Sequence, residues 1–293
     1  MNSTHRHTPL GRLPERQLPF STPLARLEDL PPEFRKTAQR MLEGRAEKIR
    51  HILFTPEFGT FGEYCPATVF VVTDDEWVAM SAEKSGAPSV RYADFQQTRL
   101  VEFALALLSG HVVLESGEST ESACVLRFNL TSSDLFRSAL VDVLSAAPDS
   151  VADDPSTLSG FAGLSMGLQS SLSEAVMPGD RALALVAWTR NDVASPTDRL
   201  LIQPGGLLLT EHYVCLFAVE DPAETMTPND LSHYNRGVIY LRRDLPIAAG
   251  RERHGELDKL TLTVGEGACA SVVSVLLPHI HKDAIDRLLA LLG

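Results

Sequence analysis

Residues 69–75 read VFVVTDD, and residues 206–212 read GLLLTEH. Each stretch is an apolar run that ends at a threonine followed by an acidic residue. Apolar runs bounded by such turn residues are typical of a strand that enters a tight turn. The apolar residues that follow, at 77–80 and 213–217, have the composition of returning strands. The sequence therefore predicts two β-hairpins, one in each half of the chain.

The two halves can be aligned through these hairpins. Thr73 and Thr210 are 137 positions apart, whereas Tyr92 and Tyr240, each in a later strand-like segment, are 148 apart. Two further pairs, in the last strand and the last helix of each half, are 147 apart: Phe128 with Val275, and Leu144 with Leu291. One insertion of about ten residues near 221–235 reconciles these offsets, because loops tolerate insertions at little cost. We therefore expect an internal duplication, with chance similarity as the alternative because the identities are few.

Helical segments flank the predicted strands. Residues 1–29 are rich in Pro and Arg and are expected to be extended or disordered. Residues 30–33 open a first helix, since proline is tolerated in a first turn. Residues 131–134 fit the capping box that precedes a helix. Residues 147–160 are expected to form a linker, and residues 161–177 a second lead-in helix.

The segments VFVVTDD and GLLLTEH, the later VRYADF and VIYLRRDL, and the closing strand and helix resemble bacterial pleckstrin-homology-like (PH-like) domains in tandem. The resemblance implies an α+β fold of two PH-like repeats with lead-in helices. Each repeat is then a β-rich, partly open barrel of two antiparallel sheets, capped by a C-terminal helix that covers its apolar side chains. The implied division is an N-terminal arm and helix at 1–46, repeat 1 at 47–146, a linker and helix at 147–179, and repeat 2 at 180–293.

The resemblance implies a binding or scaffolding module without catalysis. Family members that bind phosphoinositides use Lys and Arg in the loop between the first two strands. No Lys or Arg lies between Thr55 and Thr68 in the first repeat, and that loop carries Glu57 and Glu63 instead. The equivalent loop of the second repeat contains Arg190 and Arg199, which is a weak basis for an anion site.

Composition narrows the function classes further. The net charge of −12 disfavours nucleic-acid and anionic membrane partners. Residues 54–189 carry eighteen Asp/Glu and six Lys/Arg, for which a solvated acidic face is the simplest explanation. No uninterrupted apolar run approaches the ~20 residues of a transmembrane helix, so no integral membrane segment is expected.

The cysteines and the N-terminus point to a cytoplasmic location. The four cysteines lie far apart and form no C-x-x-C pair: Cys65, Cys124, Cys215 and Cys269. Such spacing fits a reducing compartment and disfavours a cysteine zinc site. The N-terminal segment also lacks the apolar core of a signal peptide.

Residues 163–167 read GLSMG, which matches the G-x-S-x-G nucleophile elbow of serine esterases. An elbow needs a buried strand that leads into it, but the preceding residues 153–160 are loop-like. One helical face would instead be formed by Phe161, Leu164, Leu168, Leu172 and Val176. Ser165 is then expected inside a helix, without a base that activates it. An α/β-hydrolase that uses Ser165, with Asp244 and His279 as nominal partners, is the alternative function.

Two other groups of polar side chains are candidate sites. His279 and His281 would face one way on a strand, but only Asp283 is near enough to complete a metal set, and it is expected to cap the last helix. No metal or cofactor is therefore predicted. The main basic cluster is Arg236, Arg242, Arg243, Arg251 and Arg253. Guanidinium groups suit a phosphate or an acidic protein partner, with a solvated, charge-balanced face as the alternative.

The apolar stretch 103–108 is expected to be a buried strand, or an edge that joins repeats or subunits. No phosphate-binding loop, dinucleotide fingerprint or paired-carboxylate signal is visible. The sequence therefore favours a non-enzymatic binding or scaffolding module that uses a protein partner or self-association, and it does not identify the ligand.

Overall fold

The computed structural model describes residues 20–60, 63–84, 86–106, 109–117, 123–145, 150–219, 236–267 and 270–292. Strand β1 (Thr22–Pro23) and the 3-10 turn η1 (Leu27–Asp29) lead into helix α1 (Pro32–Met41). Residues 20–29 are therefore not the free arm that the sequence predicts. Pro23 is compatible with a sheet edge, where no N–H donor is needed, and Leu27 is buried. Residues 1–19 lie outside the described residues.

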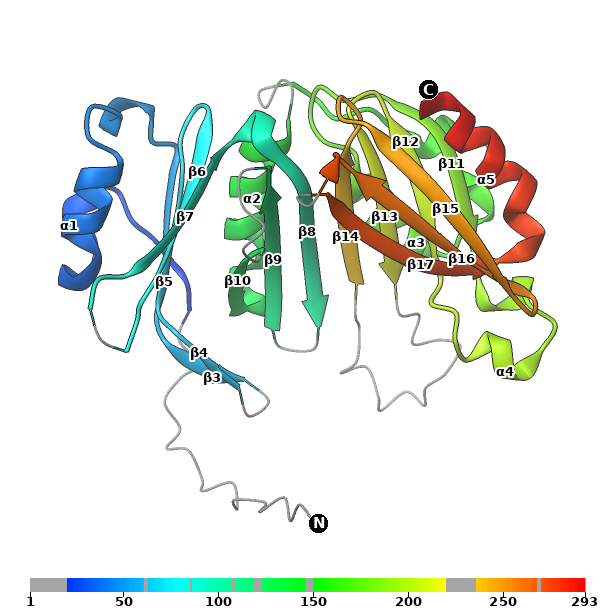
Figure 1. Cartoon of the computed structure of the whole chain (residues 1–293), viewed down its shortest axis with the longest axis horizontal. Coiled ribbons are helices and arrows are strands. Elements are labelled where there is room, and N and C mark those ends of the chain that lie inside the picture. Colours follow the sequence, from blue (N-terminus) through cyan, green and yellow to red (C-terminus); the bar gives the residue numbers. More distant parts are fainter. Residues whose placement is uncertain are drawn as a thin grey trace, which may run out of the picture.

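The first sheet has five antiparallel strands, all from the first half. Their order is β1, β2 (His51–Thr55), β5 (Thr68–Val72), β6 (Glu76–Ser81) and β7 (Ser89–Asp94). Helix α1 covers the outer face of this sheet, where Phe34 and Ala38 are fully buried in a cluster with Val69 and Val71 (Figure 1). A small separate hairpin, β3 (Phe58–Thr60) with β4 (Glu63–Cys65), projects between β2 and β5.

The second sheet has seven strands and joins the two halves. Its order is β10 (Cys124–Asn129), β9 (Ser109–Ser116), β8 (Thr98–Ala106), β14 (Arg236–Arg242), β13 (Tyr213–Val219), β12 (Gly205–Thr210) and β11 (Ala182–Trp188). The junction is the β8–β14 pairing, which runs antiparallel from Leu100 opposite Leu241 to Leu105 opposite Arg236. The apolar stretch that begins at Phe103 therefore joins the halves, up to Leu105. Residues 107 and 108 lie outside the described residues.

The third sheet belongs to the second half and crosses in front of β13 and β14 (Figure 1). It contains β15 (Ile247–His254), β16 (Leu257–Val264) and β17 (Ser271–Pro278), in that order. Helix α5 (Lys282–Leu289) closes the second half, as α2 (Ser133–Leu144) closes the first. The remaining α-helices of the described chain are α3 (Met166–Ala175) and the single-turn α4 (Pro196–Arg199).

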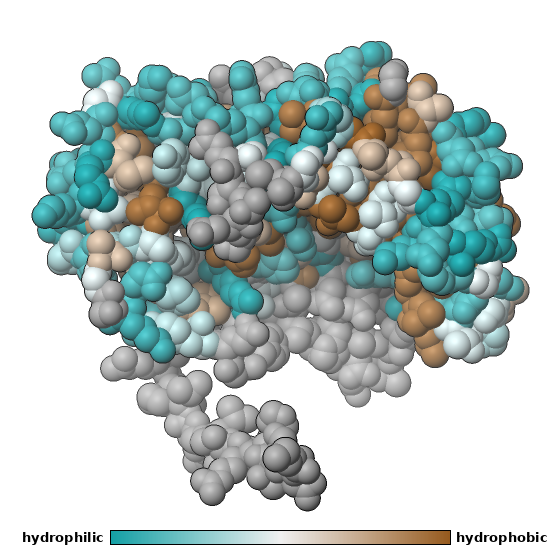
Figure 2. Space-filling model, in the orientation of Figure 1, coloured by the Kyte–Doolittle hydropathy of each residue, from teal (hydrophilic) through white to brown (hydrophobic). Residues whose placement is uncertain are grey.

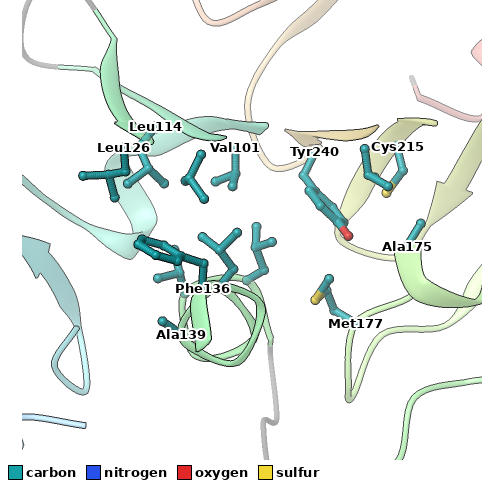
Figure 3. Packing of buried hydrophobic residues seen from close by; sticks show 14 of the residues in the cluster. Val101, Leu114, Leu126, Phe136, Ala139, Ala175, Met177, Cys215 and Tyr240 are labelled. Atoms are coloured by element: carbon teal, nitrogen blue, oxygen red, sulfur yellow. The ribbon is translucent and has the colours of Figure 1, made fainter. Parts of the chain in front are cut away.

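The largest core is shared by the two halves. Figure 3 shows Val101 and Phe136 of the first half facing the same interior as Tyr240 and Met177. A second cluster lies between the second half's strands and α5, and a third lies beneath α1. Because both a sheet and a core cross the junction, separating the halves would expose apolar surface on each.

The order of four antiparallel strands, three antiparallel strands and a helix occurs in both halves. The same side-chain contact closes the hairpin of each. The Thr73 Oγ1 accepts a hydrogen bond from the Glu76 N–H at 3.1 Å, and the Thr210 Oγ1 accepts one from the Tyr213 N–H at 2.9 Å. Both threonines are completely buried. Thr73 and Thr210 therefore occupy equivalent positions, as the sequence predicts.

Strand register tests the alignment of the halves. Val78 lies opposite Tyr92, and Cys215 lies opposite Tyr240, which reproduces the offsets of 137 and 148. The extra residues of the second half therefore fall between β13 and β14. The predicted loop at 221–235 lies outside the described residues.

The predicted offset of 147 at the end of each half is wrong by two positions. The last helices begin at Ser133 and Lys282, 149 apart, so the counterpart of Phe128 is Leu277 and not Val275. Phe128 and Leu277 are both completely buried. The fold is α+β with antiparallel sheets and no closed barrel among the described strands, whereas its assignment to PH-like domains stays a prediction.

The predicted capping box at 131–134 does not form. Ser132 precedes α2, but its hydroxyl accepts a hydrogen bond from the Ser21 backbone N–H at 3.0 Å. The Asn129 side chain instead accepts from the Thr131 N–H and closes the turn before the helix. The Thr131 hydroxyl, which the pattern assigns to the cap, donates to the Asn129 Oδ1 at 2.9 Å instead.

Candidate functional site

An open groove of about 430 Å³ lies where β17 crosses the seven-stranded sheet. Strands β8, β13 and β14 form its floor, and the β17 residues 273–276 form one wall. The residues that follow α4 contribute Leu201 and Gln203 at its end. Figure 2 shows hydrophobic surface, in brown, on this face of the second half. The groove therefore combines an apolar floor with the side of a strand.

A row of small residues runs across four adjacent strands, and Ala104, Gly237 and Ala218 of this row line the groove. Ala104, Gly237, Ala218 and Gly205 lie directly opposite one another in successive pairings, and Trp188 closes the row on β11. We call these four positions the small-residue row. Neighbouring strands are about 4.8 Å apart, so the row is about 14 Å long. Without side chains beyond Cβ, it forms a trough in the sheet surface.

The two glycines of the row have different reasons to be glycine. A Cβ at Gly205 would stand 2.4 Å from the carbonyl oxygen of Phe217, so the backbone leaves no room for a side chain. A Cβ at Gly237 would meet only the Ala104 Cβ at 3.3 Å and ordinary contacts beyond it. The fold therefore requires Gly205, whereas Gly237 mainly keeps the trough open.

The wall of the groove is an edge with unpaired backbone groups. The His279 N–H donates to the Glu256 carbonyl at 2.8 Å, which sets the alternation of hydrogen-bonded pairs along β16 and β17. The N–H and C=O groups of Val272, Ser274 and Leu276 therefore face away from β16. Strand β17 is last in its sheet, and no strand of the described chain pairs with this edge.

The opposite edge of the same sheet is protected. Strand β15 carries Arg251, Glu252, Arg253 and His254. Charged residues are a common means of preventing an edge strand from pairing with another chain. Strand β17 reads SVVSVLLP, without a charge, and Val272 is 61% exposed. Only the edge that borders the groove lacks this protection.

One acidic side chain lines the groove. Glu102 lies on β8 beside Ala104, and its Oε1 is 3.1 Å from the His111 Nε2. Both side chains are about one third exposed. Arg236 also borders the groove, but its Nη1 donates to the Glu174 Oε1 at 2.9 Å. The groove therefore has an accessible carboxylate at its β8 end.

The arginines of the predicted basic cluster do not come together at this groove or at any other single site. Arg236 is at the first residue of β14, whereas Arg242 and Arg243 lie at the other end. The Arg242 Nη1 donates to the Phe95 carbonyl at 2.7 Å, and the Arg243 Nη2 donates to the Leu291 carbonyl at 2.9 Å. These arginines tie β14 to neighbouring backbone.

The other two arginines of the cluster lie on β15. The Arg251 Nη2 is 2.7 Å from the Asp286 Oδ1 of α5, and the Arg253 Nε donates to the Gly255 carbonyl at 2.7 Å. Arg190 and Arg199, the second repeat's loop arginines, donate to the carbonyls of Ile202 and Val193. All these guanidinium groups have local partners, and anion binding by them stays a prediction.

The sequence predicts Ser165 inside a helix, but the structure places it at the N-cap of α3. A 3-10 segment (Phe161–Gly163) begins after Gly160, whose φ is 91°, and ends at the extended Leu164 before the helix begins. The exposed Ser165 hydroxyl accepts from the Leu168 N–H at 3.4 Å. Helix capping accounts for a serine here. Its nominal partner His279 has its Nδ1 3.0 Å from both carboxylate oxygens of Asp258.

The two histidines near the C-terminus lie in a 3-10 turn (His279–His281), not at alternate positions of a strand. The His281 Nε2 is 3.2 Å from the Asp192 Oδ2, so the two rings face different carboxylates. Asp283 lies in the first turn of α5, but no side chain makes a capping hydrogen bond there. Within the described ranges, no three His, Cys, Asp or Glu side chains are grouped as a metal site would require.

Comparison of the chain with protein-family models, with curated proteins and with solved structures found no match. None of the described helices has the length and hydropathy to cross a lipid bilayer. Sequence reasoning located β8 and β17 but missed the groove between them. The signal that could have found it was the small residues in strand segments otherwise rich in leucine and valine.

Proposed function

We propose that the chain is a cytoplasmic, non-enzymatic binding or scaffolding protein that recognises another protein. The observation that carries this proposal is the open groove, with its apolar floor and unpaired strand edge. An unpaired strand edge and exposed apolar surface each favour association with another chain. Their occurrence side by side is therefore typical of an interaction site.

The arrangement of the two halves supports a scaffold. We propose that each half is a PH-like unit, since four strands, three strands and a closing helix occur in the same order twice. The β8–β14 pairing and the shared core make the two units one body. A ligand bound at the second unit would thus be held at a set distance from the surfaces of the first.

An α/β-hydrolase that uses Ser165 is the competing function, and the geometry favours it less. A nucleophile elbow stands at the end of a strand in a mostly parallel sheet. The residue pairings between the described strands are antiparallel, and a 3-10 turn precedes Ser165. The serine hydroxyl has no neighbouring histidine among its described hydrogen-bond partners.

Two experiments test the proposed function. Selection of linear 12-residue peptides from a random display library on the full-length chain is expected to enrich binders with micromolar or better affinity. A library from which no binder emerges would refute protein-segment recognition. Treatment with a fluorophosphonate probe is expected to leave the chain unlabelled, and labelling that Ser165→Ala abolishes would establish the hydrolase instead.

A further inference from the structure

We infer that the groove binds an extended segment of a partner protein, which adds as a fourth strand to the free edge of β17. This inference rests on the proposed function and specifies its ligand. The sheet would then have the order β15, β16, β17 and the bound segment. Addition of a strand to an exposed edge is an established mode of peptide recognition, in which main-chain hydrogen bonds give affinity and side-chain pockets give specificity.

The hydrogen-bonding groups of the edge match such a segment. Val272, Ser274 and Leu276 present N–H and C=O groups on the side of β17 that faces away from β16. Ser274 and Leu276 line the groove. Groups that recur every second residue, about 6.6 Å apart, match the repeat of an extended chain and no other backbone conformation.

The small-residue row sets the size of the side chains that enter. β17 crosses in front of β14 and β13 (Figure 1), so a segment beside it runs along the row and not along the strands beneath. The ~14 Å row accommodates four to five extended residues. Their side chains that point toward the sheet meet Ala104, Gly237 and Ala218. We therefore expect Ala, Val or Thr at alternate positions of the segment.

The charge of the groove favours a cationic residue at one end. Glu102, whose Oε1 contacts the His111 Nε2 at 3.1 Å, is still about one third exposed at the β8 end of the floor, and Arg236 is paired with Glu174. A Lys or Arg of the segment near β8 would thus approach an accessible carboxylate. The bound segment is accordingly small, apolar and basic at one end.

A second copy of this chain fits the groove less well through its β7 or β15 edge. Strand β7 is one edge of the first sheet and carries Arg91, Tyr92 and Asp94. Tyr92 and Arg91 are too large for a row built from Gly and Ala. The protected β15 edge presents Arg and Glu side chains. The β7 and β15 edges therefore lack the alternating small side chains that the row requires. The β11 edge, which reads ALALVAW, has such residues, so the oligomeric state tested below distinguishes a second copy from a partner segment.

The decisive variants close the trough or remove one edge donor. Gly237→Val fills the row; its Cβ would lie 3.3 Å from the Ala104 Cβ, a tight contact that a shift of a few tenths of an ångström relieves, so the strand is expected to fold. Gly250→Val on β15 is the matched control, because a Cβ there meets no atom within 4 Å. Ser274→Pro removes the central outward N–H, and Ser274→Ala keeps that N–H while losing the same hydroxyl. Circular dichroism verifies that each variant is folded.

Binding of the selected peptides by fluorescence anisotropy separates the outcomes. We expect Gly237→Val and Ser274→Pro each to weaken binding by about tenfold or more, and the two controls to change it less than about twofold. We also expect Glu102→Gln to weaken peptides that contain Arg. Peptides that bind all variants equally would overturn the groove inference while leaving the proposed binding function intact.

Amide hydrogen exchange by NMR gives an independent readout within one strand. The amides of Val272, Ser274 and Leu276 are expected to exchange rapidly in the free chain and to slow by about tenfold or more when a selected peptide is bound. The amides of Val273 and Val275 already bond to β16 and serve as internal controls. Protection at other surfaces alone would overturn the inference. So would light scattering that shows a dimer dissolved by Ser274→Pro, because a second copy would then occupy the edge.

Discussion

Replacement of Thr210 by valine tests the account of the second hairpin. The side chains have nearly the same shape, but valine lacks the hydroxyl that accepts from the Tyr213 N–H at 2.9 Å and donates to the Tyr213 carbonyl at 3.2 Å. Thr210 is completely buried, and Tyr213 nearly so, so water cannot replace these bonds. An unsatisfied buried N–H costs about 1–3 kcal/mol. We expect a loss of about 2 kcal/mol in the free energy of unfolding.

Urea unfolding followed by circular dichroism measures this loss. In thermal unfolding, a loss of about 2 kcal/mol corresponds to a decrease in Tm of about 3 °C for a chain of this size. Thr210→Ser is the matched control, because it keeps the hydroxyl and loses one buried methyl group, at a cost of about 1 kcal/mol. A valine variant that is as stable as wild type, or more stable than the serine variant, would refute the reasoning.

The first hairpin refines the same prediction. In that hairpin the Thr73 backbone N–H also donates to the Glu76 carbonyl, at 2.9 Å. Thr73→Val leaves the carbonyl of Glu76 satisfied but removes the acceptor of the Glu76 N–H, the longer contact from the Asp75 N–H at 3.4 Å, and the hydroxyl's bond to the Asp75 Oδ1. We expect Thr73→Val to lower the free energy of unfolding by about the same 2 kcal/mol as Thr210→Val. A clear difference between the two variants would show that the two turns are not equivalent.

Three other variants or probes test the fold. Gly205→Ala should lower the free energy of unfolding by about 1–3 kcal/mol in urea titrations, since its Cβ would lie 2.4 Å from the Phe217 carbonyl oxygen; unchanged stability would contradict the required glycine. Burial raises the pKa of the Cys124 thiol to about 12, so the thiol stays protonated at pH 8, and iodoacetamide should label it far more slowly in the native than in the unfolded chain by mass spectrometry. Glu174→Gln should lower the free energy of unfolding by about 1–2 kcal/mol, because two half-buried arginines lose their counter-charge. In urea titrations with 1 M salt, the difference from wild type should be smaller. A salt-independent difference would point to packing instead.

Local patterns were sufficient for most individual strands and for the two hairpins. Strand β15 was missed because the segment 248–253 reads AAGRER, which has neither the alternation nor the β-branched residues of a strand. Its pairing with β16 outweighs those propensities. The sequence predicts a helix from residue 161, but α3 begins only after Ser165. The error arises because the apolar spacing continues through the 3-10 segment 161–163 and the extended Leu164.

Contacts between distant segments were not available from the sequence. The apolar composition of residues 103–105 indicates a buried strand, but nothing local names β14 as its partner more than one hundred residues later. The groove depends on that pairing, because Ala104 joins Gly237 and Ala218 only across it. The arginine cluster failed to converge for the same reason: neighbours in sequence became opposite ends of a strand.

The junction between the halves raises the question of why pairing stops at two units. A shift of 148 positions superposes the register of β8 and β9 on that of β15 and β16. Phe103, Ala104 and Leu105 of the junction then correspond to Arg251, Glu252 and Arg253. With apolar residues there, β15 could receive the β7 strand of a further molecule as β8 receives β14, and a head-to-tail filament would grow without closure. The charged residues at 251–253 therefore prevent β15 from making, with a further molecule, the strand pairing that β8 makes with β14.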